Sequence, residues 1–134
     1  MGHTAFTEED GVVTKVSTRS VQDTVEHLRS LLAARGVKLF LVIDQRAQAR
    51  SVGLDLRETV LVMFGNPSMG TPVMDHSPLS ALDLPLKVLV WDDDGTTNVS
   101  YLPPGVLAAR HHLEPDLERN LSAIDALTDA LIAT

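Results

Sequence analysis

The sequence predicts an α+β fold, a two-layer sandwich whose mostly antiparallel or mixed sheet of about five strands carries helices packed on one face. An apolar strand, residues 87–91, and an alternating return strand, residues 96–101, are joined by Asp-Asp-Asp-Gly, a turn sequence typical of a β-hairpin. Helical patterns stand at both ends of this hairpin-rich middle. Regular alternation of strands and helices, which a doubly wound parallel sheet needs, is missing.

The N-terminal part predicts a tail, a strand and a helix. Residues 1–10 are polar and acidic, so we expect a flexible tail before a single domain over residues 11–134. Residues 11–18 are rich in β-branched side chains and alternate loosely, as in a strand. Ser20 begins a pattern that resembles a capping box, and apolar residues then recur at helical spacing through residues 21–35.

Two further strands and a short helix are predicted before residue 65. Residues 37–43 (VKLFLVI) form an unbroken apolar run, which predicts a strand buried on both faces or at the centre of the sheet. Residues 44–53 are polar with several alanines, which predicts a short surface helix. Residues 59–64 (TVLVMF) predict the strand that follows.

Helix-capping residues stand directly before proline at three places in the next segment. Asn66, Thr71 and Ser77 each precede a proline, and proline favours the first turn of a helix while disfavouring helix in the residue before it. The pattern predicts short helical turns, started and stopped in succession. Beyond the hairpin, residues 106–113 predict another short helix, and an apolar stripe predicts a C-terminal helix over residues 116–133.

Composition excludes several classes of function. The net charge is −7 and the basic residues are scattered, which disfavours a nucleic-acid partner and an anionic membrane surface. The chain has no cysteine, which excludes thiol catalysis, disulfides and Cys-ligated metal centres. The N-terminus lacks the pattern of a secretory signal, and no apolar run is long enough for a membrane span. We therefore expect a soluble, cytoplasmic protein.

The capped turns offer one candidate binding site. Backbone N–H groups at a helix N-terminus attract anions, and Gly65 and Gly70 would let a ligand approach the backbone next to Asn66 and Thr71. The alternative is that the caps satisfy only their own helices. We favour that alternative, because no phosphate-binding glycine fingerprint accompanies the turns.

The histidines offer a second candidate. Arg110, His111 and His112 form the densest cluster, in which Arg110 can bind a carboxylate or phosphate and His111 can act as acid, base or ligand. His76 follows Asp75, but neighbours in a helix face different directions. The alternative for the cluster is a helix C-terminus whose cations offset the helix dipole. No metal-ligand spacing is present, so we expect no metal and no cofactor.

Four segments in fixed order resemble a known family. They are LFLVID at 39–44, VGLDLRETVLVMFGNPSMGTPVM at 52–74, ALDLPLKVLVWDDDG at 81–95 and YLPPGVLAARHHL at 101–113. Over residues 12–115 the chain resembles the prokaryotic domain of unknown function 302. The resemblance implies a compact α+β domain and dimeric assembly, and it brings no established activity.

The resemblance also marks particular positions. Family members commonly carry His directly after the Asp of the Ile-Asp motif, where this chain has Gln45, which neither titrates nor binds metal comparably. Positions that match the family motif are Asp44, Gly65, Asn66, Pro67, Gly70, Thr71, Met74, Asp83, Leu84, Pro85, Lys87, Tyr101, Arg110 and His111.

The preferred function is a non-catalytic small-ligand-binding or accessory module that acts as a homodimer. The ligand would be small and anionic or polar. An enzyme that uses His111 or His76 as general acid/base, with Arg110 binding an anionic substrate, is the alternative. A purely structural interaction domain is the third possibility, and Asp83 and Lys87 are expected to decorate strand ends. The candidate ligand-binding residues are Asn66, Gly70, Thr71, Tyr101, Arg110 and His111.

Overall fold

The fold is built on one antiparallel sheet. The structure, a computed structural model, describes residues 5–7 and 11–134. Six strands lie in the order β1-β2-β6-β5-β4-β3, and every neighbouring pair is antiparallel. The strands are β1 (Ala5–Thr7), β2 (Val13–Ser17), β3 (Lys38–Asp44), β4 (Thr59–Gly65), β5 (Leu86–Asp93) and β6 (Thr96–Tyr101).

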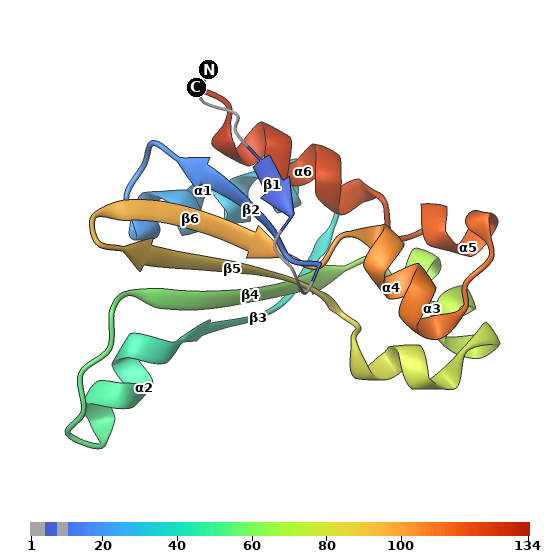
Figure 1. The fold of residues 1–134 in the computed structure, drawn as a ribbon, viewed down its shortest axis with the longest axis horizontal. Coiled ribbons are helices and arrows are strands. Elements are labelled where there is room, and N and C mark those ends of the chain that lie inside the picture. Colours follow the sequence, from blue (N-terminus) through green and yellow to red (C-terminus); the bar gives the residue numbers. More distant parts are fainter. Residues whose placement is uncertain (1–4, 8–10) are drawn as a thin grey trace.

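The helices divide into three groups around the sheet (Figure 1). Helices α1 and α6 lie across one face, where they contact β2, β3, β4 and β5. Helices α3, α4 and α5 and the 3-10 helix η1 gather at one end, and α2 lies at the other end. This arrangement confirms the predicted α+β class. The helices are α1 (Val21–Ala34), α2 (Gln45–Ser51), α3 (Pro67–His76), η1 (Pro78–Leu82), α4 (Pro104–His111), α5 (Pro115–Arg119) and α6 (Ala123–Ile132).

Two hydrophobic clusters hold these layers together. The larger cluster packs α1 and α6 against the sheet through fully buried side chains such as Leu28, Leu131 and Val62. The smaller cluster joins α3 to α4 and to the start of the C-terminal region through Val73 and Leu107. Burial of each large aliphatic side chain contributes about 1.5–3 kcal/mol, so both clusters stabilise the fold.

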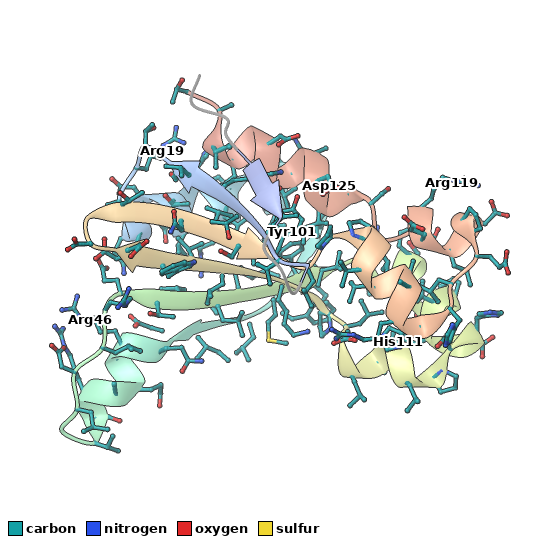
Figure 2. All side chains as sticks on the ribbon, viewed as in Figure 1. Arg19, Arg46, Tyr101, His111, Arg119 and Asp125 are labelled. Carbon is teal, nitrogen blue, oxygen red and sulfur yellow. The ribbon has the colours of Figure 1, made fainter. Side chains whose placement is uncertain are left out.

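A buried polar network ties α6 to the sheet. The Lys15 ammonium donates to Thr128 Oγ1 at 2.7 Å and lies 2.8 Å from Asp129 Oδ1, while the Tyr101 hydroxyl donates to Asp125 Oδ1 at 2.6 Å. Figure 2 shows Tyr101 and Asp125 close together where β6 meets α6. Burial alone would lower the pKa of Lys15, but the hydrogen bond to Asp129 and the interactions with Tyr101 outweigh burial and raise that pKa.

Several local predictions are confirmed. The Ser20 side chain accepts a hydrogen bond from the Asp23 amide at 3.0 Å and caps α1. Residues 44–53 contain the expected short helix, α2. In the hairpin between β5 and β6, Asp94 and Gly95 have positive φ angles of 52° and 95°, as a type I′ turn requires.

The position of β3 corrects a prediction. The apolar run was expected to be buried on both faces or central, but β3 lies at the sheet edge, with Phe40 and Leu41 exposed to 43% and 50%. An apolar run shows that a strand is suited to burial. It does not show which other part of the protein, if any, covers that strand. This edge strand is therefore an exposed apolar strip of the chain.

The proline-rich segment corrects a second prediction. Asn66 caps α3 and Ser77 precedes η1, but Thr71 begins no new turn, because α3 continues through Pro72 to His76. The fully buried Val73 follows this proline directly. Tertiary packing of that residue therefore offsets the local preference for a break.

The chain ends differ from the prediction in two respects. The single helix expected over 116–133 is divided into α5 and α6, which a turn separates. Within the predicted tail, Ala5–Thr7 pair with β2 as β1. Residues 1–4 and 8–10 lie outside the described residues.

Candidate functional site

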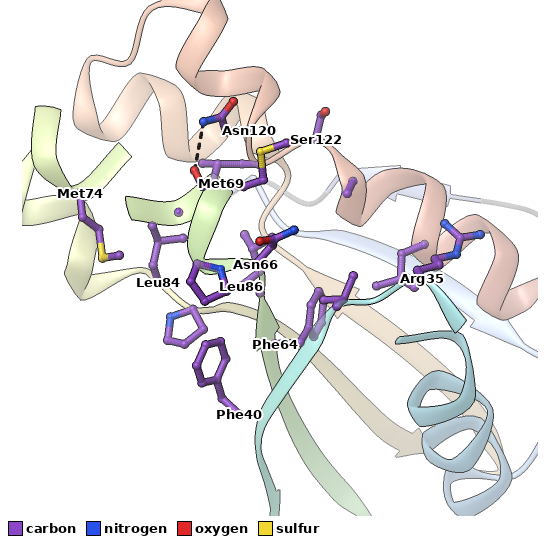
Figure 3. A pocket seen from close by; sticks show the side chains of 18 of the residues that line it. Arg35, Phe40, Phe64, Asn66, Met69, Met74, Leu84, Leu86, Asn120 and Ser122 are labelled. Atoms are coloured by element: carbon purple, nitrogen blue, oxygen red, sulfur yellow. Dashed lines mark hydrogen bonds between the residues drawn. The ribbon is translucent and has the colours of Figure 1, made fainter. Parts of the chain in front are cut away.

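A large cavity of about 730 Å³ lies where the two hydrophobic clusters meet (Figure 3). Its walls come from α3, the adjoining ends of β4 and β5, Phe40 of β3 and the connection between α5 and α6. The lining is mostly apolar, and Figure 3 shows Phe64, Met69, Met74 and Leu86 around the space. The volume falls within the range of about 300–1,000 Å³ that is typical of small-molecule sites.

Hydrogen bonds fix one wall of the cavity. The side-chain oxygen Oδ1 of Asn66 accepts from the Ser68 amide at 3.1 Å and from the Ser68 hydroxyl at 2.7 Å, which caps α3. The Asn120 side chain donates to the Met69 carbonyl at 3.0 Å and so ties the α5–α6 connection to α3. Two amide side chains thus contribute polar atoms to an otherwise apolar wall.

The charged residues of the lining are both basic. They are Arg35, at the end of α1, and Arg119, which forms an ion pair with Asp116. Among residues 5–7 and 11–134, no carboxylate side chain contributes to the lining, although the chain as a whole carries a net charge of −7. The cavity is therefore more favourable to anions than the average surface of this protein.

Glycines leave space in the cavity. A Cβ atom built on Gly70 would meet only Met74 Cε, at 3.9 Å, which is an ordinary contact. A Cβ atom on Gly65 would lie 3.5 Å from the Phe40 ring. Larger side chains at Gly70 would therefore occupy the space that the cavity now provides.

The predicted site residues do not form one constellation. Asn66 and Gly70 line the large cavity, whereas Thr71 is exposed and outside its lining. Tyr101 lines a second, smaller cavity. Arg110 and His111 line neither of these cavities.

Arg110 and His111 instead converge on Asp83. Arg110 Nη1 lies 3.1 Å from both carboxylate oxygens, and His111 Nε2 lies 2.6 Å from Oδ2. Burial raises the pKa of the Asp83 carboxyl, but the hydrogen bonds from His111 and Arg110 outweigh burial and lower it. The cluster joins the η1–β5 connection to the end of α4, where Figure 2 labels His111. Asp83 therefore anchors this cluster and does more than decorate a strand end.

Other chemistry suggested by the sequence finds little support in the geometry. His76 is exposed and has no hydrogen bond or ion pair with the residues that the structure describes. Across residues 5–7 and 11–134, no three or more His, Asp or Glu side chains gather as a metal site would require. The helices of this described part also lack the combination of length and hydropathy needed to cross a membrane.

Sequence reasoning missed most of the cavity wall. Met69, Met74 and Phe40 line the cavity, but the candidate ligand-binding residues from the sequence include none of them, and Phe40 falls in a strand predicted to be buried. Met69 and Met74 lie within or just after the Asn66–Gly70 motif, whereas Phe40 comes from a strand distant in the sequence, and their one shared signal is an apolar side chain. That signal does not distinguish the wall of a cavity from a packed core.

Comparison with known proteins places this site in context. Residues 13–131 match the model of "Domain of unknown function DUF302". Over 106 residues the chain is 37% identical to "Fluoride-specific ion channel FluC 1" of Brucella suis biovar 1 (strain 1330) and to "Fluoride-specific ion channel FluC 2" of Brucella melitensis biotype 1. That region is 78% of this chain but only 42% and 39% of those relatives.

A solved structure shares the fold. An uncharacterised conserved DUF302 protein from Bacillus stearothermophilus superposes with a TM-score of 0.77 at 22% sequence identity, over 91% of this chain and 95% of that one. At this identity the likeness supports the fold alone. The family match covers most of the sequence and all the strands from β2 to β6. The chain belongs to the DUF302 family.

Proposed function

We propose that the protein is a non-catalytic module that binds one small amphipathic molecule in the large cavity. The observation that carries the proposal is an apolar space of about 730 Å³ with few polar groups and only basic charged residues in its lining. An apolar body would pack against Phe64, Met74 and Leu86, and an anionic or polar head would be held near Asn66 or Arg35. This is a more apolar ligand than the sequence suggested.

A fluorescent probe tests this proposal. The probe 8-anilinonaphthalene-1-sulfonate combines an aromatic body with one anionic group, and we expect it to bind and then to be displaced by decanoate but not by acetate. Gly70→Leu should abolish displaceable binding by filling the cavity, while Gly70→Ala should retain it. Unchanged decanoate-displaceable binding in Gly70→Leu would refute the cavity as the site.

We also propose that the protein acts as a homodimer. Val60, Val62 and Phe64 of β4 are buried on the side of α1, so the alternate residues Leu61 and Met63 point to the other face of the sheet. The cross-strand register adds neighbours to this face, which we call the open face. On β3, β4 and β5 the open face presents Leu41, Ile43, Leu61, Met63, Lys87, Leu89 and Trp91.

The connection between α2 and β4 provides further exposed apolar surface. Val52, Leu54 and Leu56 are exposed to 72%, 66% and 38%, and they lie close in sequence to three arginines and three acidic residues. A surface with both charge signs around exposed apolar side chains is complementary to a second copy of itself. We therefore assign the dimer interface to the β3 edge of the open face, around Leu41 and Ile43, and to this connection, which leaves Lys87 and Leu89 of β5 uncovered.

The assembly is measurable by light scattering coupled to size-exclusion chromatography. The wild type is expected at twice the monomer mass of 14.5 kDa, and the double variant Leu41→Asp/Leu54→Asp at the monomer mass. Leu79→Asp is the matched control, because Leu79 is 70% exposed on η1, outside the proposed interface. A monomeric wild type at about 100 µM, a concentration at which a typical transient dimer forms, would refute the proposal.

An accessory role beside a membrane channel is a second candidate. It is supported by the identity of 37% to part of Brucella proteins named as fluoride-specific ion channels. If the domain recognises fluoride, sodium fluoride will raise the thermal midpoint above that in equal sodium chloride. Equal midpoints in the two salts would refute fluoride recognition by this chain and leave the cavity proposal standing.

A further inference from the structure

A second cavity of about 320 Å³ lies beside the DLPLK segment. It lies among η1, α4 and the strands β4, β5 and β6, and its walls are mainly leucine, including Leu61, Leu89 and Leu107. Its charged lining residues are Asp83 and Lys87. A space of this size, walled by branched aliphatic side chains, accommodates a small apolar molecule.

The amine of Lys87 is held in an unusual way. Its Nζ atom donates to the main-chain carbonyls of Asp83 at 3.1 Å and Pro85 at 3.0 Å, and no third acceptor is found among the described residues. A neutral amine has two N–H groups and one lone pair, whereas an ammonium has three N–H groups and no lone pair. The two acceptors match the two N–H groups of the neutral form and leave its lone pair free, whereas the third N–H of an ammonium would need a partner from solvent.

The burial and the charges around Lys87 also favour the neutral form of its amine. Burial lowers the pKa of the Lys87 amine, and the negative charge of Asp83 opposes this effect only in part. The Asp83 carboxylate is itself neutralised, because Arg110 and His111 both bind it. The carboxylate beside Lys87 is thus already paired with the Arg110 guanidinium behind it.

We propose that Lys87 is a nucleophilic lysine that forms a reversible imine with a small apolar aldehyde or ketone held in this second cavity. The Nζ lone pair attacks the carbonyl carbon, the C–N bond forms, and the carbonyl oxygen takes a proton to give a carbinolamine. The carbinolamine then loses its hydroxyl group and the remaining N–H proton together as one water molecule, and the C=N bond forms. One water is released in total, and no oxidant or reductant takes part.

The chain contains its own comparison lysines. It has three lysines, of which Lys15 is buried with its ammonium paired to Asp129. Lys38 is exposed, and its ammonium lies 5.1 Å from the centre of the Phe40 ring. Only Lys87 combines a cavity wall with hydrogen bonds that suit a neutral amine.

Reductive trapping tests the proposal. The protein at pH 7 is mixed with limiting 3-methylbutanal and sodium cyanoborohydride, and the modified peptides are quantified by mass spectrometry over time. Lys87 is expected to react faster than Lys38, since a lowered pKa leaves more free amine at pH 7 and the second cavity holds the aldehyde beside it. The preference should disappear in 6 M urea, at about the denaturant concentration that unfolds most small domains. Equal or faster labelling of Lys38 in the folded protein would refute the proposal and leave Lys87 a structural clamp only.

Two variants and a second aldehyde complete the design. Lys87→Arg keeps a cation that can donate to the same carbonyls but forms no imine, so its folded fraction by circular dichroism should match the wild type while labelling at residue 87 is lost. Gly70→Leu alters only the large cavity and should leave labelling of Lys87 unchanged, so the two proposals fail separately. A polymeric dextran aldehyde, which cannot enter a cavity of about 320 Å³, should show no preference for Lys87, and a retained preference would refute the role of the cavity.

Discussion

Replacement of Asp83 by Ala tests whether the Arg110–His111 cluster stabilises the fold. The carboxylate joins the η1–β5 connection to α4 and is 19% exposed, against 8% for the His111 side chain and 50% for that of Arg110. The variant removes both contacts and leaves His111 Nε2 in a largely buried position without its acceptor. The cost should therefore arise mainly from the histidine.

The magnitude follows from the exposure of each partner. A half-exposed ion pair such as that with Arg110 contributes about 0.5 kcal/mol. A buried hydrogen bond to a charged acceptor contributes about 1.5–3 kcal/mol, so the total is about 2.5 kcal/mol. For a domain of 134 residues, the unfolding entropy is about 0.28 kcal/mol per kelvin, and the thermal midpoint should fall by about 9 °C.

Urea unfolding at several pH values provides the assay. The lowered pKa of Asp83 means that its contribution is complete above 3.8, the unfolded value, and is lost as the pH falls through the folded value. The difference between wild type and variant should therefore vanish in acid. Asp75→Ala is the control, because Asp75 is exposed and unpaired within the described part of the chain. A loss below about 0.5 kcal/mol at pH 7, or additive losses in Asp83→Ala/His111→Ala, would refute the reasoning.

Three other variants test the packing of the fold by thermal or urea unfolding. Gly70→Ala should stabilise the protein by about 0.5–1 kcal/mol, because Gly70 lies inside α3 with room for a methyl group, and destabilisation would contradict that geometry. Leu28→Ala should cost about 3 kcal/mol, while the same change at the exposed Leu79 should cost under about 0.5 kcal/mol; equal losses would contradict the assigned core. Lys15→Met should remove the contribution of the Lys15 ammonium to the free energy of unfolding. That contribution is complete below pH 10.5 and is lost as the pH rises through the raised folded pKa. Identical alkaline unfolding of variant and wild type would contradict the Lys15–Asp129 pair.

Features that depend on neighbouring residues were predictable from the sequence. Ser20 and Asn66 cap helices with their own side chains, and the Asp94–Gly95 turn is specified by two residues that tolerate positive φ. Each of these signals lies within a few residues of the structure it specifies. The family resemblance was likewise carried by local motifs and was confirmed by the match over residues 13–131.

Features that depend on which surface covers a residue were not predictable. The apolar stripe of the C-terminal region is regular, but Leu121 packs in the smaller cluster and Ile124 in the larger one, and the chain turns between them. The motif residues Asn66 and Arg110 also lie at different places. Asn66 lines the large cavity, whereas Arg110 binds Asp83 and is not part of the lining. The spacing of residues along the chain does not show which distant residues they will contact in the fold.

The place of the large cavity at the junction of the two clusters has a dynamic consequence. Helices α3, α4 and α5 share few buried residues with the sheet, and the cavity removes packing at the boundary through which they contact it. Amide hydrogens of α3 and α4 should therefore exchange through a partial opening of lower free energy than those of β4 and α1. A molecule that fills the cavity would add contacts to both sides, and the exchange of the two regions would then become a single cooperative event.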